Sequence, residues 1–115
     1  MSCKVSKIGS ANPDEVKNDL DYLMIMFETI APRARSGFAN EGRGAMIVDL
    51  TNLPEVGGGY LSISRLLVEL GAVPDKKLGQ TLQSYDPLTE FVAIVRRSDR
   101  SLHGYVLRYA TDEDA

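Results

Sequence analysis

The sequence predicts a small α+β domain with a largely antiparallel sheet. Three patterns indicate this fold: an apolar run over residues 45–50, helical periodicity over residues 13–31, and two β-rich runs over residues 89–97 and 102–110. Strands and helices do not alternate regularly along the chain, which favours a small sheet with helices packed against it rather than a doubly wound parallel sheet.

The run over residues 45–50 predicts the central strand. Five of its six side chains are apolar, two of them β-branched, and the run is bracketed by Gly44 and by Thr51-Asn52. A short continuous apolar run with such boundaries is typical of a strand that is buried on both faces. We therefore expect this strand to have neighbours on both sides and a covering layer above and below it.

Residues 13–31 predict a long helix. Asn12 is a good N-cap, Pro13 suits the first helical position, and two carboxylates follow at the positive end of the helix dipole. Pro32 is expected to end the helix. Apolar residues recur at spacings of three and four at Val16, Leu20, Leu23, Phe27 and Ile30. Further apolar residues widen that surface, which predicts either deep burial or contact with another subunit.

The segments around these elements are less strongly patterned. Residues 60–63 fit either a short strand or the start of the next helix. Two short helices follow, one closed by Gly71 and one beginning near Pro74. Residues 1–11 show no periodic pattern, and residues 111–115 form an acidic end; both segments of this single domain are expected to be flexible.

The two C-terminal runs predict a hairpin with a four-residue loop over residues 98–101. This loop would place Ile94 opposite Tyr105 and Arg96 opposite His103. Both faces of the hairpin are apolar, so we expect both to be covered.

Composition narrows the class of protein. A chain of 115 residues with 43% hydrophobic and 25% charged residues is an ordinary single globular domain. Cys3 is the only cysteine, which favours a reducing, cytoplasmic environment. No signal-peptide pattern and no membrane-spanning apolar run is present, and a net charge of −3 with a pI near 5.1 does not favour nucleic acid as a partner.

Asp49 and the Gly57–Gly59 triplet are the first candidate site residues. An acid at the end of a central strand occurs at catalytic and magnesium sites, although Asp49 is equally suited to ending a strand. A glycine-rich loop before a helix is typical of phosphate sites. The triplet fits neither standard phosphate-binding pattern, so a flexible connector is the simpler interpretation.

Arg96, Arg97 and His103 are the remaining candidates. The arginines near the hairpin, together with Arg33, Arg35 and Arg43, could bind an anion or an acidic segment. The single histidine lacks companions at metal-ligand spacing, so no metal or other cofactor is predicted. Nucleophilic chemistry would require His103 to meet Asp49 or a serine in space.

The sequence therefore predicts a non-catalytic cytoplasmic protein that acts through protein–protein contacts, including self-association as a homodimer. The apolar surface of the sheet and the long helix exceeds what so few helices would cover. The alternative is a small anionic-ligand domain, or a small enzyme, with a cleft near Asp49, the Gly57–Gly59 loop, the arginines and His103. Convergence of Asp49, His103 and an arginine in one pocket would favour that alternative.

Overall fold

The computed structural model describes residues 3–9, 12–38, 44–71, 75–87 and 89–109, with side chains of α1 described up to residue 30. This part of the chain forms a five-stranded mixed sheet and three helices, which confirms the predicted α+β class. In chain order the elements are β1 (Cys3–Lys7), α1 (Pro13–Phe38), β2 (Gly44–Asp49), β3 (Gly57–Ser62), α2 (Ile63–Leu70), α3 (Lys76–Ser84), β4 (Glu90–Arg96) and β5 (Leu102–Tyr109).

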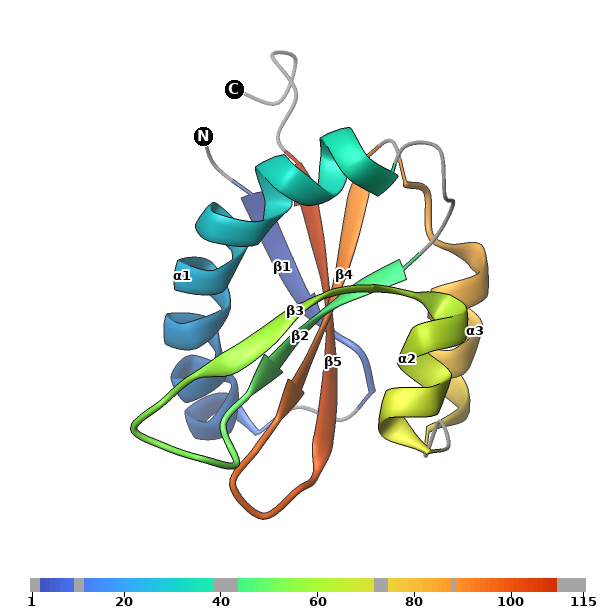
Figure 1. The fold of residues 1–115 in the computed structure, drawn as a ribbon. Helices are drawn as coiled ribbons and strands as arrows, with labels where there is room; N and C mark the ends of the chain where they lie inside the picture. Colours follow the sequence, from blue (N-terminus) through green and yellow to red (C-terminus); the bar gives the residue numbers. More distant parts are fainter. Residues whose placement is uncertain (1–2, 10–11, 39–43, 72–74, 88, 110–115) are drawn as a thin grey trace.

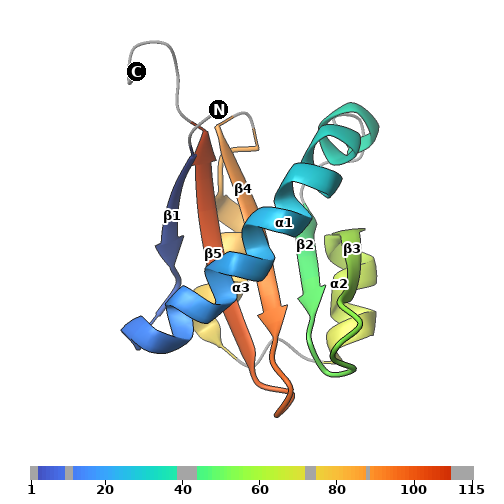
Figure 2. The ribbon, with the colours of Figure 1, turned by 90° about the vertical axis from the view of Figure 1, so that its left-hand side faces the viewer.

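The sheet order is β1-β5-β4-β2-β3, with β2 and β4 parallel and the other neighbours antiparallel. Helix α1 covers one face, and α2 and α3 cover the other (Figures 1 and 2). Each face has its own core: Leu23, Phe27, Val48 and Phe91 pack on the α1 side, and Ile47, Leu66, Leu82 and Ile94 pack on the α2–α3 side. Helices therefore shield both apolar faces within one chain.

The prediction of an interior strand is confirmed in β2. It lies between β4 and β3, and Ala45 to Val48 are at most 3% exposed. The strand begins at Gly44, one residue earlier than expected, and Leu50 follows it with 6% exposure. Side chains that alternate between two buried faces explain why residues 45–48 are all apolar.

Helix α1 is longer than predicted, because it continues beyond Pro32 to Phe38. A proline inside a helix removes one backbone hydrogen bond and its ring crowds the preceding turn, which bends the helix if it does not end it. The axis of α1 changes direction in its second half (Figure 1). The prediction that Pro32 ends this helix is therefore wrong.

The first residues form an element that was not predicted. Strand β1 pairs with β5 at one margin of the sheet, with Val5 opposite Leu107. Val5 packs against the α1-side core, and Ile8 packs against the α2–α3 side. This short segment is held by backbone pairing with β5 and by the packing of these two side chains. Its sequence therefore shows almost no periodic pattern.

The predicted hairpin exists, but its register is wrong by one residue. Arg97 N–H donates to Ser101 O at 3.0 Å, and Arg100 N–H donates to Arg97 O at 2.8 Å with Arg100 at φ 70°. The loop therefore has three residues, with a left-handed residue in the third position. Tyr105 lies opposite Ala93 rather than Ile94. Each set of apolar β5 side chains therefore shares a face of the sheet with a different set of β4 side chains from the one predicted.

The Gly57–Gly59 triplet is not a connector loop, as the sequence suggested, but the first half of strand β3. Gly58 lies opposite Val48 at φ 135°, and a Cβ there would lie 1.9 Å from the Ile47 carbonyl oxygen. The strand continues to Ser62, and α2 begins at Ile63, which settles the conformation of residues 60–63. Gly58 is therefore required for the close pairing of β3 with β2.

We expect Gly58→Ala to lower the free energy of unfolding by about 2 kcal/mol, because it imposes both a clash and a strained φ. Gly59→Ala is the matched control, since a Cβ at Gly59 meets nothing within 4 Å. Urea unfolding of the two variants measures the difference. Equal stability of the two variants would contradict the structural role of Gly58.

Candidate functional site

The structure divides the predicted site residues between the two faces of the sheet. Arg96 is the last residue of β4 and Arg97 follows it directly, so their side chains project to opposite sides. Arg96 joins Asp49 on the face covered by α2, whereas Arg97 contacts Asp19 of α1 and His103 on the other face. The structure therefore does not bring Asp49 and His103 together in one pocket.

The first cluster links β2, β4 and α2. The Arg96 guanidinium lies 3.2 Å from carboxylate oxygens of both Asp49 and Glu69. Asp49 also accepts hydrogen bonds from the backbone N–H and the hydroxyl of Thr51, at 3.0 and 2.7 Å. Partial burial alone would raise the pKa of Asp49, but the Thr51 hydrogen bonds and Arg96 outweigh it and lower that pKa. These contacts fit the interpretation of Asp49 as a strand terminator.

Two shallow depressions flank the Asp49–Arg96 pair. One of about 380 Å³ includes Arg100, and one of about 250 Å³ includes Gly58 and Gly59. Two carboxylates already balance the charge of Arg96, and the glycines belong to a strand rather than to a helix N-terminus. Anion binding at this cluster stays a prediction.

The second cluster joins α1 to the hairpin through a buried carboxylate. Asp19 is 2% exposed and accepts from Arg97 Nε at 3.2 Å and from Arg97 NH2 at 2.7 Å. The Tyr105 hydroxyl donates to the same carboxylate, and Glu15 lies 3.1 Å from the guanidinium. Burial, followed by the hydrogen bond to Asp19, raises the pKa of Tyr105, and the hydrogen bond to Asp19 raises the pKa of Arg97. The cluster is an ion pair between a buried carboxylate and a partly buried guanidinium, with its hydrogen bonds completed.

Sequence reasoning missed Asp19, although the sequence contains a signal for it. Asp19 lies three residues after Val16 and four before Leu23, so helical spacing places it beside the apolar stripe. A carboxylate in that position needs a buried partner, and Arg97 lies 78 positions further along the chain. The location of that partner required the tertiary structure.

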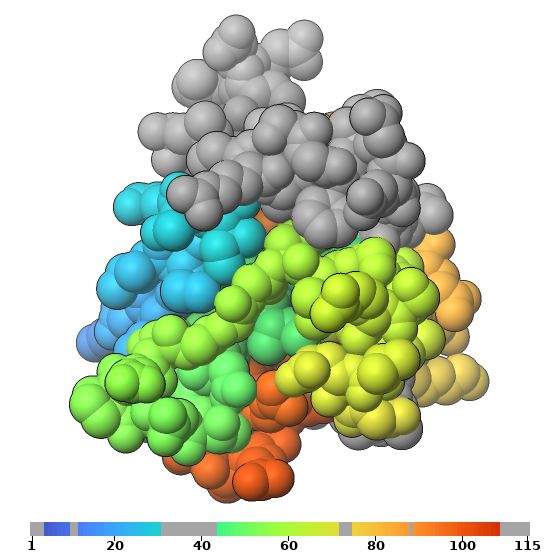
Figure 3. All heavy atoms as spheres, viewed as in Figure 1, coloured from blue at the N-terminus to red at the C-terminus, as the bar shows by residue number. Residues whose placement is uncertain are grey.

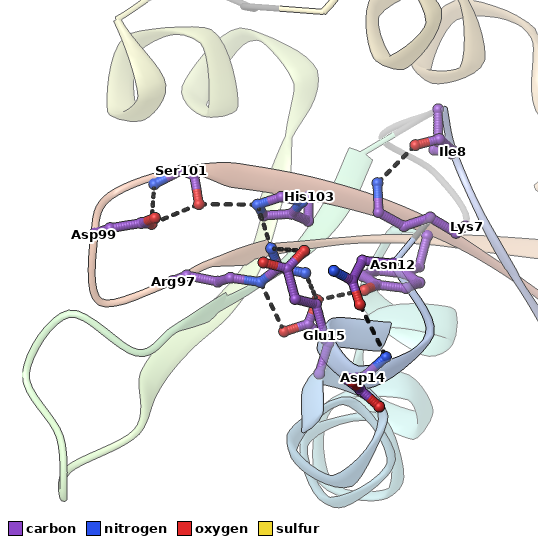
Figure 4. Close-up of polar contacts among 11 residues, drawn as sticks. Lys7, Ile8, Asn12, Asp14, Glu15, Arg97, Asp99, Ser101 and His103 are labelled. Atoms are coloured by element: carbon purple, nitrogen blue, oxygen red, sulfur yellow. Dashed lines mark hydrogen bonds and ion pairs between the residues drawn. The ribbon is translucent and has the colours of Figure 1, made fainter. Parts of the chain in front are cut away.

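His103 meets a serine, as a nucleophilic site would require, but the surrounding contacts oppose that chemistry (Figure 4). His103 Nε2 lies 2.8 Å from both the Ser101 hydroxyl and Arg97 NH1. An arginine N–H only donates, so Nε2 is assigned as the acceptor and its lone pair is occupied. The Ser101 hydroxyl lies 2.5 Å from the Asp99 carboxylate. The imidazole is therefore not placed to take a proton from Ser101.

Two searches of the described residues concern metal ligands and membrane-spanning helices. They contain no group of three or more His, Cys, Asp and Glu side chains that could hold a metal ion. No helix among them has the length and apolar character needed to cross a bilayer. The side chains of Cys3, Arg33, Arg35 and Arg43 lie outside the residues whose side chains are described.

Comparison with protein-family models, curated proteins and solved structures finds no match to this chain.

We expect Asp19→Asn to lower the free energy of unfolding by about 3 kcal/mol, because the variant leaves the Arg97 guanidinium without its buried anionic partner. Glu90→Gln is the control, since it removes a carboxylate that faces Arg108, a side chain 65% exposed. Glu90 itself is 20% exposed, and glutamine keeps an oxygen that can accept from the Asp86 N–H, so the change should cost less than about 1 kcal/mol. Urea unfolding of both variants measures the contrast, and equal losses would show that Asp19 acts as an ordinary surface acid.

We expect the protein to lose stability as the pH falls below the ordinary histidine value of 6.5. Burial, and then the positive charge of Arg97, lower the pKa of His103 in the folded state. The unfolded chain therefore binds the proton first, and stability that is present above pH 6.5 is lost below it. Unfolding curves between about pH 5 and pH 8 should show this loss in the native protein and a smaller loss in His103→Gln. Parallel pH profiles would contradict the assignment.

Proposed function

We propose that this chain is a non-catalytic protein that acts through protein–protein contacts and that it forms a homodimer. The observation that carries the proposal is the outer edge of β3, followed directly along the chain by helix α2 with its two exposed apolar residues. The proposed interface combines the backbone of this edge strand with the exposed side of that helix.

Strand β3 is the marginal strand of the sheet, with β2 as its neighbour in the described part of the chain. It crosses the front of the molecule between α1 and α2, and its atoms reach the surface there (Figures 1 and 3). Three of its six residues are glycines, and none is charged or proline. Edge strands that avoid pairing usually carry lysine, proline or a cover. The composition of β3 instead favours pairing with another strand.

Helix α2 adds apolar surface to this edge. Leu67 is 41% exposed and Val68 is 84% exposed, although Leu66 beside them is fully buried. A single exposed apolar residue is common, but two on the helix that directly follows an open edge strand favour a contact surface. These residues would meet their copies if two chains paired through β3.

The charges on α2 favour a second copy of the chain as the occupant. Arg65 and Glu69 are both exposed and lie one helical turn apart. If two α2 helices lie antiparallel about a two-fold axis, Arg65 faces the partner subunit's Glu69, and the reverse contact forms as well. Glu69 would then contact this second arginine in addition to Arg96 of its own chain. Such an isologous surface is self-complementary in charge and in backbone hydrogen bonding.

The polar clusters support a binding role over a catalytic one. Carboxylates of Asp49 and Glu69 hold Arg96, and Arg97 lies against Asp19 and His103. These groups stabilise contacts between elements, which leaves them poorly placed to transfer protons to a substrate. We further propose a cytoplasmic location, supported by the single cysteine, and partners other than nucleic acid, supported by the acidic pI.

Light scattering on a size-exclusion column tests the homodimer. We expect the native protein to show twice the chain mass of 12.6 kDa at micromolar concentration. Val68→Glu should return it to the single-chain mass, because the variant places two carboxylates in one apolar interface. Ile25→Glu is the control, since Ile25 is similarly exposed but lies on α1.

Two outcomes would contradict different parts of the proposal. A native protein of single-chain mass would remove the homodimer. A dimer that survives Val68→Glu but not Ile25→Glu would place the interface on α1 instead of on β3 and α2.

A further inference from the structure

A second surface, separate from the β3 edge, lies on the α1 side of the molecule. An open depression of about 560 Å³ is bounded by the first half of α1, the connection after β2 and the start of the β4–β5 loop. In Figure 2, α1 crosses this face and both connections lie together at the end of the sheet below it. Residues far apart in the sequence therefore form one concave surface.

The depression has exposed apolar residues on two of its sides. Ile25 of α1 is 65% exposed, and Leu53 of the β2–β3 connection is 47% exposed. Both residues line the depression, as does the partly buried Tyr22. Of the described large apolar side chains, only these two and the α2 pair Leu67 and Val68 are exposed to this degree. Two of them around one concavity indicate a place where apolar groups dock.

The same surface is acidic. Its lining includes the carboxylates of Glu15, Asp19 and Asp21 and the single guanidinium of Arg97. Asp19 and Glu15 lie 2.7 and 3.1 Å from the Arg97 guanidinium. Three carboxylates against one guanidinium leave the depression with an excess of two negative charges. A ligand that fits it must combine positive charge with apolar groups.

We propose that this depression docks a cationic, apolar segment of a partner protein, such as an amphipathic helix with lysines or arginines beside its apolar face. Ile25 and Leu53 would receive the apolar side chains, and Glu15 and Asp21 would attract the basic ones. An amphipathic helix that places its apolar residues in a groove is a common mode of peptide recognition. The surface shares no residue with the proposed dimer interface, so each proposal stands without the other.

The depression is preformed in the fold. Its floor contains Asp19 and Arg97, which hold α1 against β4 through two hydrogen bonds. A partner would therefore meet a surface whose main walls are already fixed relative to each other, which reduces the ordering required on binding.

The test uses the full chain and a synthetic helical peptide of about 18 residues, with leucines on one face and lysines on the other. Calorimetric titration should detect binding that weakens as salt is added. We expect Ile25→Ser and Leu53→Ser each to raise Kd roughly ten-fold, because each removes a buried apolar contact. Asp21→Asn should raise Kd roughly three-fold and reduce the dependence on salt.

The controls are matched to these changes. Val68→Ser removes an exposed apolar side chain and Glu69→Gln removes an exposed carboxylate, both from α2. Neither should change the affinity for the peptide, and a monomeric Val68→Glu variant should bind as well as the native protein. A peptide with glutamate in place of lysine should not bind.

Three results would overturn the proposal. The first is an absence of binding by the native protein, and the second is equal binding of the lysine and glutamate peptides. The third is equal weakening by the α1 and α2 variants, which would indicate non-specific attachment. If Ile25→Ser instead abolishes self-association that Val68→Glu leaves intact, the occupant is a second copy and not a separate basic partner.

Discussion

The ion pair between Asp19 and Arg97 is the contact on which the arrangement of this molecule most depends. It connects the first half of α1 to the end of β4, and the Tyr105 hydroxyl completes it from β5. A buried charge pair contributes little net stability compared with apolar packing, but removal of one partner is costly. Together with the packing of Leu23 and Phe27, it fixes the position of α1 on the sheet. The walls of the acidic depression follow from that position.

The parts of the fold that could be predicted are those whose signal is local. Residues 45–48 of β2 are all apolar because the strand is buried on both faces, and α1 begins where Asn12 accepts a hydrogen bond from the Asp14 N–H at 3.1 Å. The hairpin register was not predictable in the same way. It depends on Arg100 adopting φ 70°, a conformation that the sequence would normally mark with glycine or asparagine.

The candidate site was harder to predict because its contacts connect distant segments. Arg96 meets Glu69 across 27 positions, and Arg97 meets Asp19 across 78. The sequence nevertheless contains one relevant feature: adjacent residues of a strand point to opposite faces, so Arg96 and Arg97 cannot form one cationic cluster. Strand alternation by itself therefore argues against a shared site that would join both arginines to Asp49 and His103.

Helices cover both faces of the sheet, and this changes the reason for expecting protein partners. The sequence suggested surplus apolar surface on the sheet itself, but α1 covers one face and α2 and α3 cover the other. Among the side chains that the structure describes, the large apolar ones that remain exposed lie in two places, on α2 and around the acidic depression. A two-fold dimer through β3 would leave one depression accessible on each copy. Two copies of the same weak docking surface in one particle raise the apparent affinity for a partner that presents two basic segments, provided the spacing allows both to engage. Self-association and partner binding would then reinforce each other without any change in the fold.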